Sequence, residues 1–225
     1  IVDIFIRVNN GGTNLTKTEM LMSVVTSVWR DGRSKIDAFL KKINNYGEFD
    51  FDVDFIMRAS LFIMDKDVLV TQENVLESAN EIQNKWESIK SSITQAVGVI
   101  SYENFSKSSL RSKNSIIPIA YYFDKTNKGS VSTLSTSQMI QYLNTVQVLG
   151  FYGNHGDQAL RQIRKAMQAY LIKSSEFKFD TIQDEYEKLG NFKKLLRITK
   201  NDIDILLNSQ YGKSSFAVLS CLNSQ

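Results

Sequence analysis

In Phe5-Ile6-Arg7-Val8-Asn9-Asn10-Gly11-Gly12-Thr13-Asn14-Leu15-Thr16-Lys17-Thr18-Glu19, a predicted strand gives way to a helix. The β-branched and aromatic residues before Asn9 favour a buried strand, and the Asn-Asn-Gly-Gly run tolerates the positive φ angles of a tight turn. Thr16 and Glu19 have capping-box spacing, so we expect a helix to begin at Lys17. A strand that begins at residue 1 needs partner strands, and the rest of the sequence supplies few. We therefore expect this chain to be part of a longer protein.

Most of the remaining sequence predicts helices. Apolar residues recur at helical spacing from Ile36 to Ile43 and from Phe55 to Ile63, and each set marks a helix face directed into a core. We predict helices near 17–30, 34–45, 53–65, 72–102 with a break, 116–125, 135–151, 157–173, 181–189, 200–208 and 214–222. The fold class that follows is mainly α, a multi-helix bundle-like domain over residues 17–225. The Gly/Ser/Thr-rich segment 126–137 is a predicted loop and a candidate internal boundary.

Composition fits one compact helical body. The 225 residues and 25.6 kDa suffice to bury roughly 70% or more of the unfolded surface. No apolar run approaches the ~20 residues that cross a bilayer, so we expect no membrane partner. The single cysteine is compatible with a reducing cytosol, and we expect a cytoplasmic location. Cys221 is the only cysteine, which excludes an internal disulfide, and its apolar neighbours favour a buried thiol over a nucleophile.

Four further segments follow the opening stretch in a recognisable order: Asp52–Ala59, Trp86–Ile89, Leu110–Tyr122 and Tyr211–Leu219. Together with the Phe-x-Arg-Val-Asn-x-Gly-Gly motif, they resemble the N-terminal domain of GmrSD-type restriction endonucleases. That family is implicated in anti-phage defence, in which it cuts phage DNA with modified bases. The resemblance covers essentially the whole chain. It implies that residues 1–16 end a truncated ParB-like α/β half as a strand and turn, and that residues 17–225 are its helical region.

Two parts of that family's pattern are missing. The ParB-like half carries an Asp-Gly-Gln-Gln-Arg motif associated with nucleotide-dependent activity, and no Asp-Gly-Gln occurs here. The family's HNH nuclease domain binds a divalent metal through clustered His and Asn, whereas His155 is the only histidine of this chain. The resemblance thus implies a full-length, nucleotide- and metal-dependent DNA endonuclease whose chemistry lies in an upstream ParB-like half and a downstream HNH domain. Within this chain we predict no catalytic residue, metal ligand or cofactor.

The expected function is therefore a helical scaffold or binding part of a DNA-restriction protein, not catalytic alone. Its partners would be the rest of its own chain, with DNA as a further candidate. Two alternatives stay open. One is a module that senses modified DNA or docks a partner. The other is a purely structural connector between the nucleotide-binding and nuclease parts.

The glycine turn is the first candidate site. Backbone N–H groups at a strand-to-helix turn, together with the positive end of the following helix, can hold a phosphate. The nucleotide- or phosphate-binding candidates are Arg7, Asn9, Asn10, Gly11 and Gly12. The alternative is a tight turn that packs this element against the missing half.

A second candidate site is a basic helix face. Arg161, Arg164 and Lys165 recur at helical spacing, which makes them candidates for contacts to the DNA backbone. A solvated helix face is the alternative. A further basic cluster surrounds the second predicted helix and contains Arg30, Arg33, Lys35, Lys41 and Lys42. The net charge of +3 and pI near 8.8 permit nucleic-acid binding without specifying it.

The remaining conspicuous side chains are interpreted as structural. His155 is predicted to be an exposed loop residue, with Asp157 as the next helix N-cap. Asp52, Asp54 and Asp65 are assigned to capping and solvation. Aromatic residues inside apolar helical segments are most often core residues, and this applies to Trp86, Tyr121, Tyr122 and Phe123.

Overall fold

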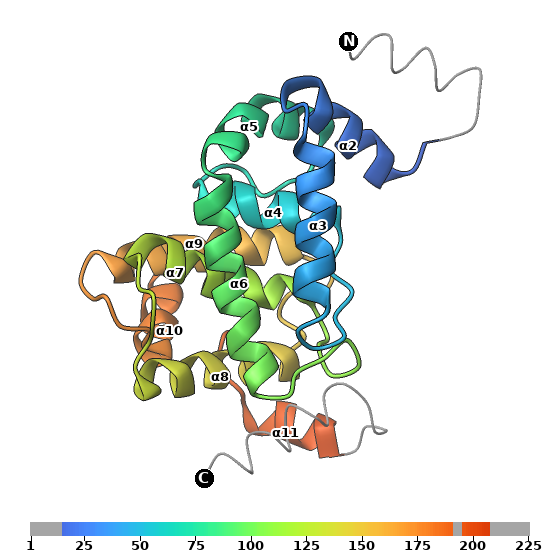
Figure 1. The fold of residues 1–225 in the computed structure, drawn as a ribbon. Coiled ribbons are helices and arrows are strands. Elements are labelled where there is room, and N and C mark those ends of the chain that lie inside the picture. The colour runs from blue at the N-terminus through green and yellow to red at the C-terminus, as the bar shows by residue number, and fades with distance from the viewer. Residues whose placement is uncertain (1–14, 191–194, 208–225) are drawn as a thin grey trace.

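The computed structural model describes residues 15–190 and 195–207, which form ten α-helices and one short 3-10 helix (Figure 1). No strand occurs within these two ranges, so the prediction of a mainly helical, bundle-like domain is confirmed. The predicted strand and turn before Leu15 and the predicted helix at 214–222 lie outside the described residues. The elements are α2 Lys17–Val28, α3 Gly32–Asn44, α4 Val53–Ile63, α5 Gln72–Asn84, α6 Trp86–Tyr102, η1 Lys113–Ile116, α7 Ile117–Thr126, α8 Thr133–Val148, α9 Gly156–Leu171, α10 Phe179–Lys188 and α11 Lys200–Leu207.

Helix starts follow the local sequence signals closely. The Thr16 hydroxyl accepts the Glu19 N–H at 3.2 Å, and the Glu19 carboxylate accepts the Thr16 N–H at 2.7 Å, so the predicted capping box is confirmed. Asp52 caps α4 by accepting the Phe55 N–H at 2.9 Å. The predicted break in 72–102 falls at Lys85, which separates α5 from α6.

The loop predicted near 126–137 is also present, although shorter. Asn127 ends α7 in the left-handed conformation with φ 49°, and Ser132 caps α8 through the Ser135 N–H at 3.1 Å. Side chains from both sides of this loop belong to one continuous hydrophobic core.

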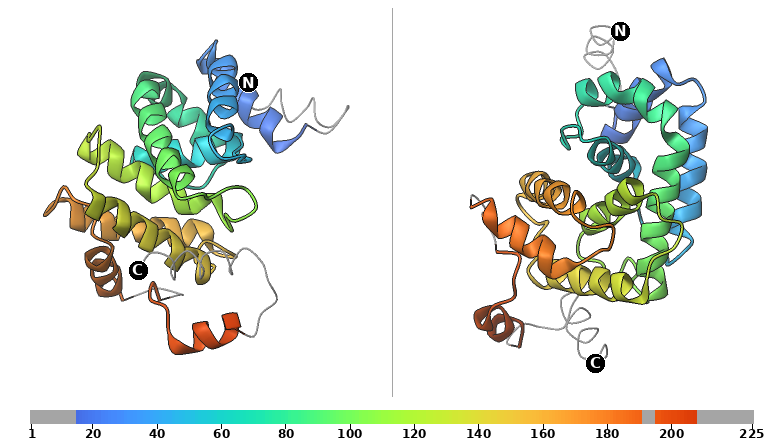
Figure 2. Two further views of the ribbon diagram at one scale, coloured as in Figure 1. Left: turned by 60° about the horizontal axis from the view of Figure 1, so that its bottom comes forward. Right: turned by 90° about the vertical axis from the view of Figure 1, so that its left-hand side faces the viewer.

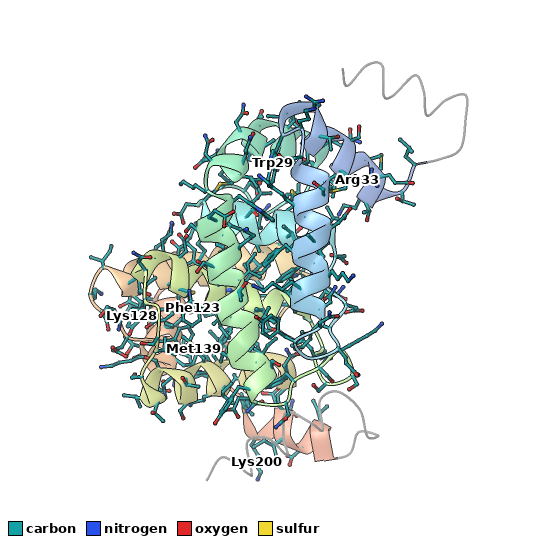
Figure 3. All side chains as sticks on the ribbon, viewed as in Figure 1. Trp29, Arg33, Phe123, Lys128, Met139 and Lys200 are labelled. Carbon is teal, nitrogen blue, oxygen red and sulfur yellow. The ribbon has the colours of Figure 1, made fainter. Side chains whose placement is uncertain are left out.

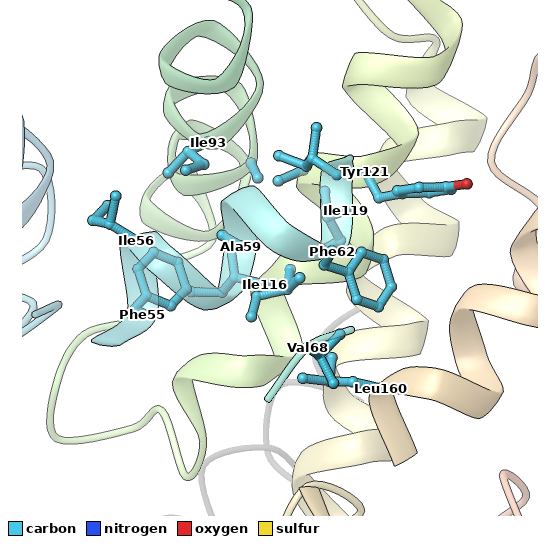
Figure 4. Close-up of a cluster of buried hydrophobic side chains, with 14 of the residues drawn as sticks. Phe55, Ile56, Ala59, Phe62, Val68, Ile93, Ile116, Ile119, Tyr121 and Leu160 are labelled. Carbon is cyan, nitrogen blue, oxygen red and sulfur yellow. The ribbon is translucent and has the colours of Figure 1, made fainter. Parts of the chain in front are cut away.

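Helix α4 is the centre of the fold (Figures 1 and 4). It packs against α7 and α2 and also contacts α3, α5 and α6. All of its 11 residues except Asp54 and Arg58 are buried. The sequence pattern predicted one apolar face for this helix, but Met57 and Leu61 on other sides are buried as well. A helix that is apolar nearly all round lies in a protein interior, and α4 does so.

The other helices surround α4 in two groups (Figure 2). α2, α3, α5 and α6 contact α4 directly. α7 also contacts α4 and packs against both α6 and α9, and α9 packs against α10. Buried Trp29, which follows α2, lies near the start of α3 (Figure 3). Trp86, Tyr121, Tyr122 and Phe123 are all buried, which confirms their assignment to the core. In the described part of the chain, no helix has the length and hydropathy of a membrane span.

Candidate functional site

A groove of about 540 Å³ lies between α3 and α6, which run side by side (Figures 1 and 2). The α3 residues that line it are spaced i, i+3, i+4 and i+7, so they share one helix face. Its lining consists of Lys35, Ala38, Phe39 and Lys42 from α3 and of Trp86, Glu87, Lys90, Ser91, Thr94 and Gln95 from α6. We call this the α3–α6 groove.

The floor of the α3–α6 groove is aromatic and tightly packed. Phe39 and Trp86 are buried and meet edge to face, with ring centroids 5.6 Å apart. Trp86 also packs edge to face against Trp29 at 5.1 Å. The Trp86 indole N–H has no hydrogen-bond partner among the described residues, so packing holds this ring in place. Because both rings are covered, neither offers an open face for a base to stack on.

Lysines dominate the rim of the α3–α6 groove. The lining contains three lysines, Lys35, Lys42 and Lys90, and one carboxylate, that of Glu87. Lys90 pairs with Glu87 at 2.8 Å, and its ammonium lies 5.8 Å from the centroid of the Trp86 ring. The Glu87 side chain is 84% exposed, so this pair is solvated and weak.

The two α3 lysines also remain accessible. Lys35 is exposed and pairs with exposed Asp31 at 2.9 Å, one helical turn away. The Lys35 hydrogen bond lowers the pKa of Asp31 below its ordinary value. Lys42 is exposed and has no carboxylate within 4.0 Å in the described ranges. Exposed pairs of this kind contribute little to stability, so a stronger anion can displace the carboxylates.

A second hollow, of about 410 Å³, lies where the loop before α9 approaches α4. Its lining includes Arg58, His155, Asp157 and Arg161, and we call it the α4–α9 cleft. The Arg58 guanidinium binds the carboxylates of Asp157 and Asp54, the latter at 3.2 Å. Each guanidinium of this cleft therefore has its own carboxylate partner, since Arg161 pairs with Asp67 at 2.7 Å.

The N-terminal end of α9 differs from the sequence prediction. Asp157 was predicted as the N-cap, and this prediction is wrong. His155 occupies the N-cap position without a side-chain capping bond, and Asp157 lies in the first turn, where Arg58 binds it. His155 is exposed, as predicted. Across residues 15–190 and 195–207, no group of three or more His, Cys, Asp or Glu side chains is arranged to hold a metal ion.

The predicted DNA-contacting residues of α9 do not form one outward face. Arg161 points to Asp67. Arg164 turns inward, lies 5.3 Å from the Phe62 ring centroid and donates to the Lys66 carbonyl beyond the end of α4. Burial lowers its pKa, which is the signature of a desolvated guanidinium. Lys165 is exposed. A DNA-binding role for these residues stays a prediction, but Arg164 has a structural role already.

The predicted phosphate-binding turn precedes the described residues. Arg7, Asn9, Asn10, Gly11 and Gly12, like Cys221, lie outside the described residues, so their roles stay predictions. Lys17, the first residue of α2, forms an ion pair with Asp54 of α4.

Sequence reasoning missed the α3–α6 groove, although part of its signal was visible. Lys35 and Lys42 stood out as basic residues of the second predicted helix, and their seven-residue spacing places them on one face. Lys90 lies 48 residues further along the chain, and nothing in the sequence pattern shows that α6 packs beside α3. The groove becomes visible only once the two helices are adjacent.

Comparison of the chain with protein-family models and with curated proteins gives no match. The likeness to GmrSD-type restriction endonucleases therefore rests on the segments quoted from the sequence.

Proposed function

We propose that this chain is the helical scaffold of a GmrSD-like DNA-restriction protein and that the described helices hold other parts of that protein in position. The observation that carries the proposal is the position of α4, which contains most of the landmark segment Asp52–Ala59. α4 is the buried centre of the fold, and charged side chains tie both of its ends to helices distant in the sequence.

The N-terminal end of α4 is held by a chain of alternating charges. Lys17 of α2 binds Asp54, Asp54 binds Arg58, and Arg58 binds Asp157 of α9. Arg58 also donates to the Val68 carbonyl at 3.2 Å. Partial burial raises the pKa of Asp54, but the hydrogen bonds and charges of Lys17 and Arg58 outweigh it, and the pKa lies below its ordinary value. Asp54 and Arg58 thus join α4 to both α2 and α9.

The C-terminal end of α4 has a matching network around Asp65, which adopts a left-handed φ of 61°. Its carboxylate accepts the Tyr121 hydroxyl at 2.8 Å and the Gln168 amide at 2.8 Å, and it pairs with Lys125 at 2.8 Å. These partners come from α7 and α9. Charged groups held by several partners fix the helices relative to one another, which is what a scaffold requires.

The residues that cleave DNA would lie in other parts of the protein. In the GmrSD-like setting, DNA cleavage would use a nucleotide and a divalent metal held by a ParB-like half and an HNH domain, and the protein would act in the cytoplasm. The second candidate, a DNA-binding module, is favoured by the lysines of the α3–α6 groove.

Phage restriction by the complete open reading frame tests the scaffold role. We expect the intact reading frame to reduce plaque formation by phages with modified DNA. Arg58→Met should abolish this restriction and lower the melting temperature, whereas Arg33→Met, at an exposed position of α3, should change neither. The isolated chain should not nick plasmid DNA with nucleotide and Mg²⁺. Nicking that a point mutation within this chain abolishes would overturn the proposal, as would a reading frame that never restricts phage.

A further inference from the structure

We propose that the α3–α6 groove binds the phosphodiester backbone of a nucleic-acid strand without reading its bases. This goes beyond the scaffold role and rests on the groove itself. Lys35 and Lys42 are seven residues apart on α3, which at 1.5 Å per residue separates them by about 10 Å along the helix. Lys90 faces them from α6.

The length of this row favours a chain of phosphates over a single one. A nucleic-acid strand carries one phosphate per nucleotide, so it can place negative charges beside all three lysines at the same time. Thr94 lies one turn beyond Lys90 and adds a hydroxyl donor to the same wall.

The charges of the α3–α6 groove are available, whereas those of the α4–α9 cleft are not. The carboxylate partners of Lys35 and Lys90 are exposed, and each ammonium also lies over a tryptophan ring, at 5.7 Å and 5.8 Å from the ring centroid. Lys42 has no carboxylate partner among the described residues. A phosphodiester chain offers each lysine a full negative charge and releases condensed counterions, which is the main source of non-specific affinity. In the α4–α9 cleft, by contrast, Arg58 and Arg161 are already neutralised.

The buried floor of the α3–α6 groove argues against recognition of bases by stacking. The rings of Phe39 and Trp86 are buried by each other and by Trp29, so bases have no exposed ring to stack on. The walls present the lysine ammonium groups and the hydroxyls of Ser91 and Thr94, which are donors that can contact phosphates.

Fluorescence anisotropy with the full chain and a labelled 20-nucleotide DNA strand tests the proposal. We expect sequence-independent binding that weakens with salt, with a slope of log K against log[salt] of about −2 for three lysine contacts on single-stranded DNA. The variant Lys35→Gln/Lys42→Gln/Lys90→Gln should lose about tenfold or more in affinity at low salt and most of this slope. The variant with Arg at all three positions should retain binding.

A matched control distinguishes an effect of the groove lysines from an effect of the overall charge of the protein. Lys107, Lys173 and Lys188 are exposed lysines outside the α3–α6 groove, and changing all three to Gln removes the same charge. This control should stay within about twofold of the wild type. Equal losses in the two triple variants would overturn the proposal, as would a wild type that does not bind DNA at low salt.

Competitors identify the ligand class. Unlabelled DNA or RNA strands should displace the probe efficiently, and ATP should not. Displacement by ATP at equal phosphate concentration would show a nucleotide site instead, and equal displacement by polyglutamate would show a site for any acidic polymer. Both outcomes would overturn the phosphodiester proposal. The scaffold role is measured by phage restriction with Arg58→Met, so a failure of one proposal is distinguishable from a failure of the other.

Discussion

The cations around α4 and those of the α3–α6 groove are held in different ways. The Arg58 side chain is 12% exposed and binds two carboxylates and a carbonyl, whereas the Lys35 side chain is 48% exposed and binds one solvated carboxylate. Arg suits the first environment because its planar group forms several fixed hydrogen bonds. Lys suits the second because its compact ammonium stays hydrated until a stronger anion arrives. Positive charge near α4 therefore stabilises the fold, and positive charge in the groove is available to a ligand.

Removal of Arg58 should produce the largest effect on stability. Arg58→Met leaves Asp54 and Asp157 without their shared cation, and we expect a loss of about 2–4 kcal/mol in the free energy of unfolding. Urea unfolding followed by tryptophan fluorescence measures this loss. Arg33→Met is the control and should stay within about 0.5 kcal/mol of the wild type. If Arg58→Met lowers the free energy of unfolding by less than about 1 kcal/mol, Arg58 contributes as little to stability as the groove lysines, and the two sets of cations do not differ.

A smaller effect is expected at the other end of α4. Asp65→Asn keeps a side chain that tolerates positive φ but removes the charge that Lys125 binds, at a cost of about 1–2 kcal/mol near pH 7. Burial raises the pKa of Asp65, but the bonds from Lys125 and Tyr121 outweigh it and hold the pKa below its ordinary value.

The sign of the pH dependence follows from that lowered pKa. A carboxyl group with a depressed folded-state pKa contributes its full stability above its unfolded pKa and loses it as the pH falls through the folded value. The wild type should therefore lose stability from about pH 5 downward, and the difference from Asp65→Asn should shrink over the same range. Urea midpoints between pH 7 and pH 3 test this. A constant difference across that range would contradict the role of the charge.

The groove lysines should matter little for stability. Lys35→Gln/Lys42→Gln/Lys90→Gln removes solvated ion pairs and two contacts of a lysine ammonium with a tryptophan ring. We therefore expect the free energy of unfolding to change by no more than about 1 kcal/mol. Thermal and urea unfolding of this variant beside the wild type provide the measurement. A loss of 2 kcal/mol or more would mean that the lysines are structural, like Arg58.

The smallest effect is expected on the outer part of α9. Arg161→Gln/Lys165→Gln should change DNA affinity by less than about twofold, or about 0.4 kcal/mol, because Asp67 already neutralises Arg161 and leaves Lys165 as the available cation. Anisotropy titrations at two salt concentrations test this. If the DNA face predicted from the sequence is right, affinity will instead fall uniformly and the salt slope will flatten.

Local signals in the sequence predicted much of the fold. Thr16 and Asp52 cap their helices through bonds within three residues, so flanking sequence was sufficient to find them. The break at Lys85 and the loop after Asn127 are local as well. Asp157 was misassigned because its partner, Arg58, lies 99 residues earlier in the chain. The Asp157 carboxylate forms an ion pair with Arg58 and does not cap the helix, and no short stretch of sequence contains both residues.

The sequence by itself determined most helices of the described residues, the caps at Thr16 and Asp52 and much of the apolar core, because capping and periodicity depend on neighbours within one or two turns. Only the tertiary structure decided what each charge does. Arg164 and Lys165 are adjacent in the sequence, yet one lies against Phe62 and the other is exposed. Lys42 and Lys90 are far apart in the sequence, yet they line one groove. The energy of a charge depends on its burial and its partners, and both are set by which helices pack together.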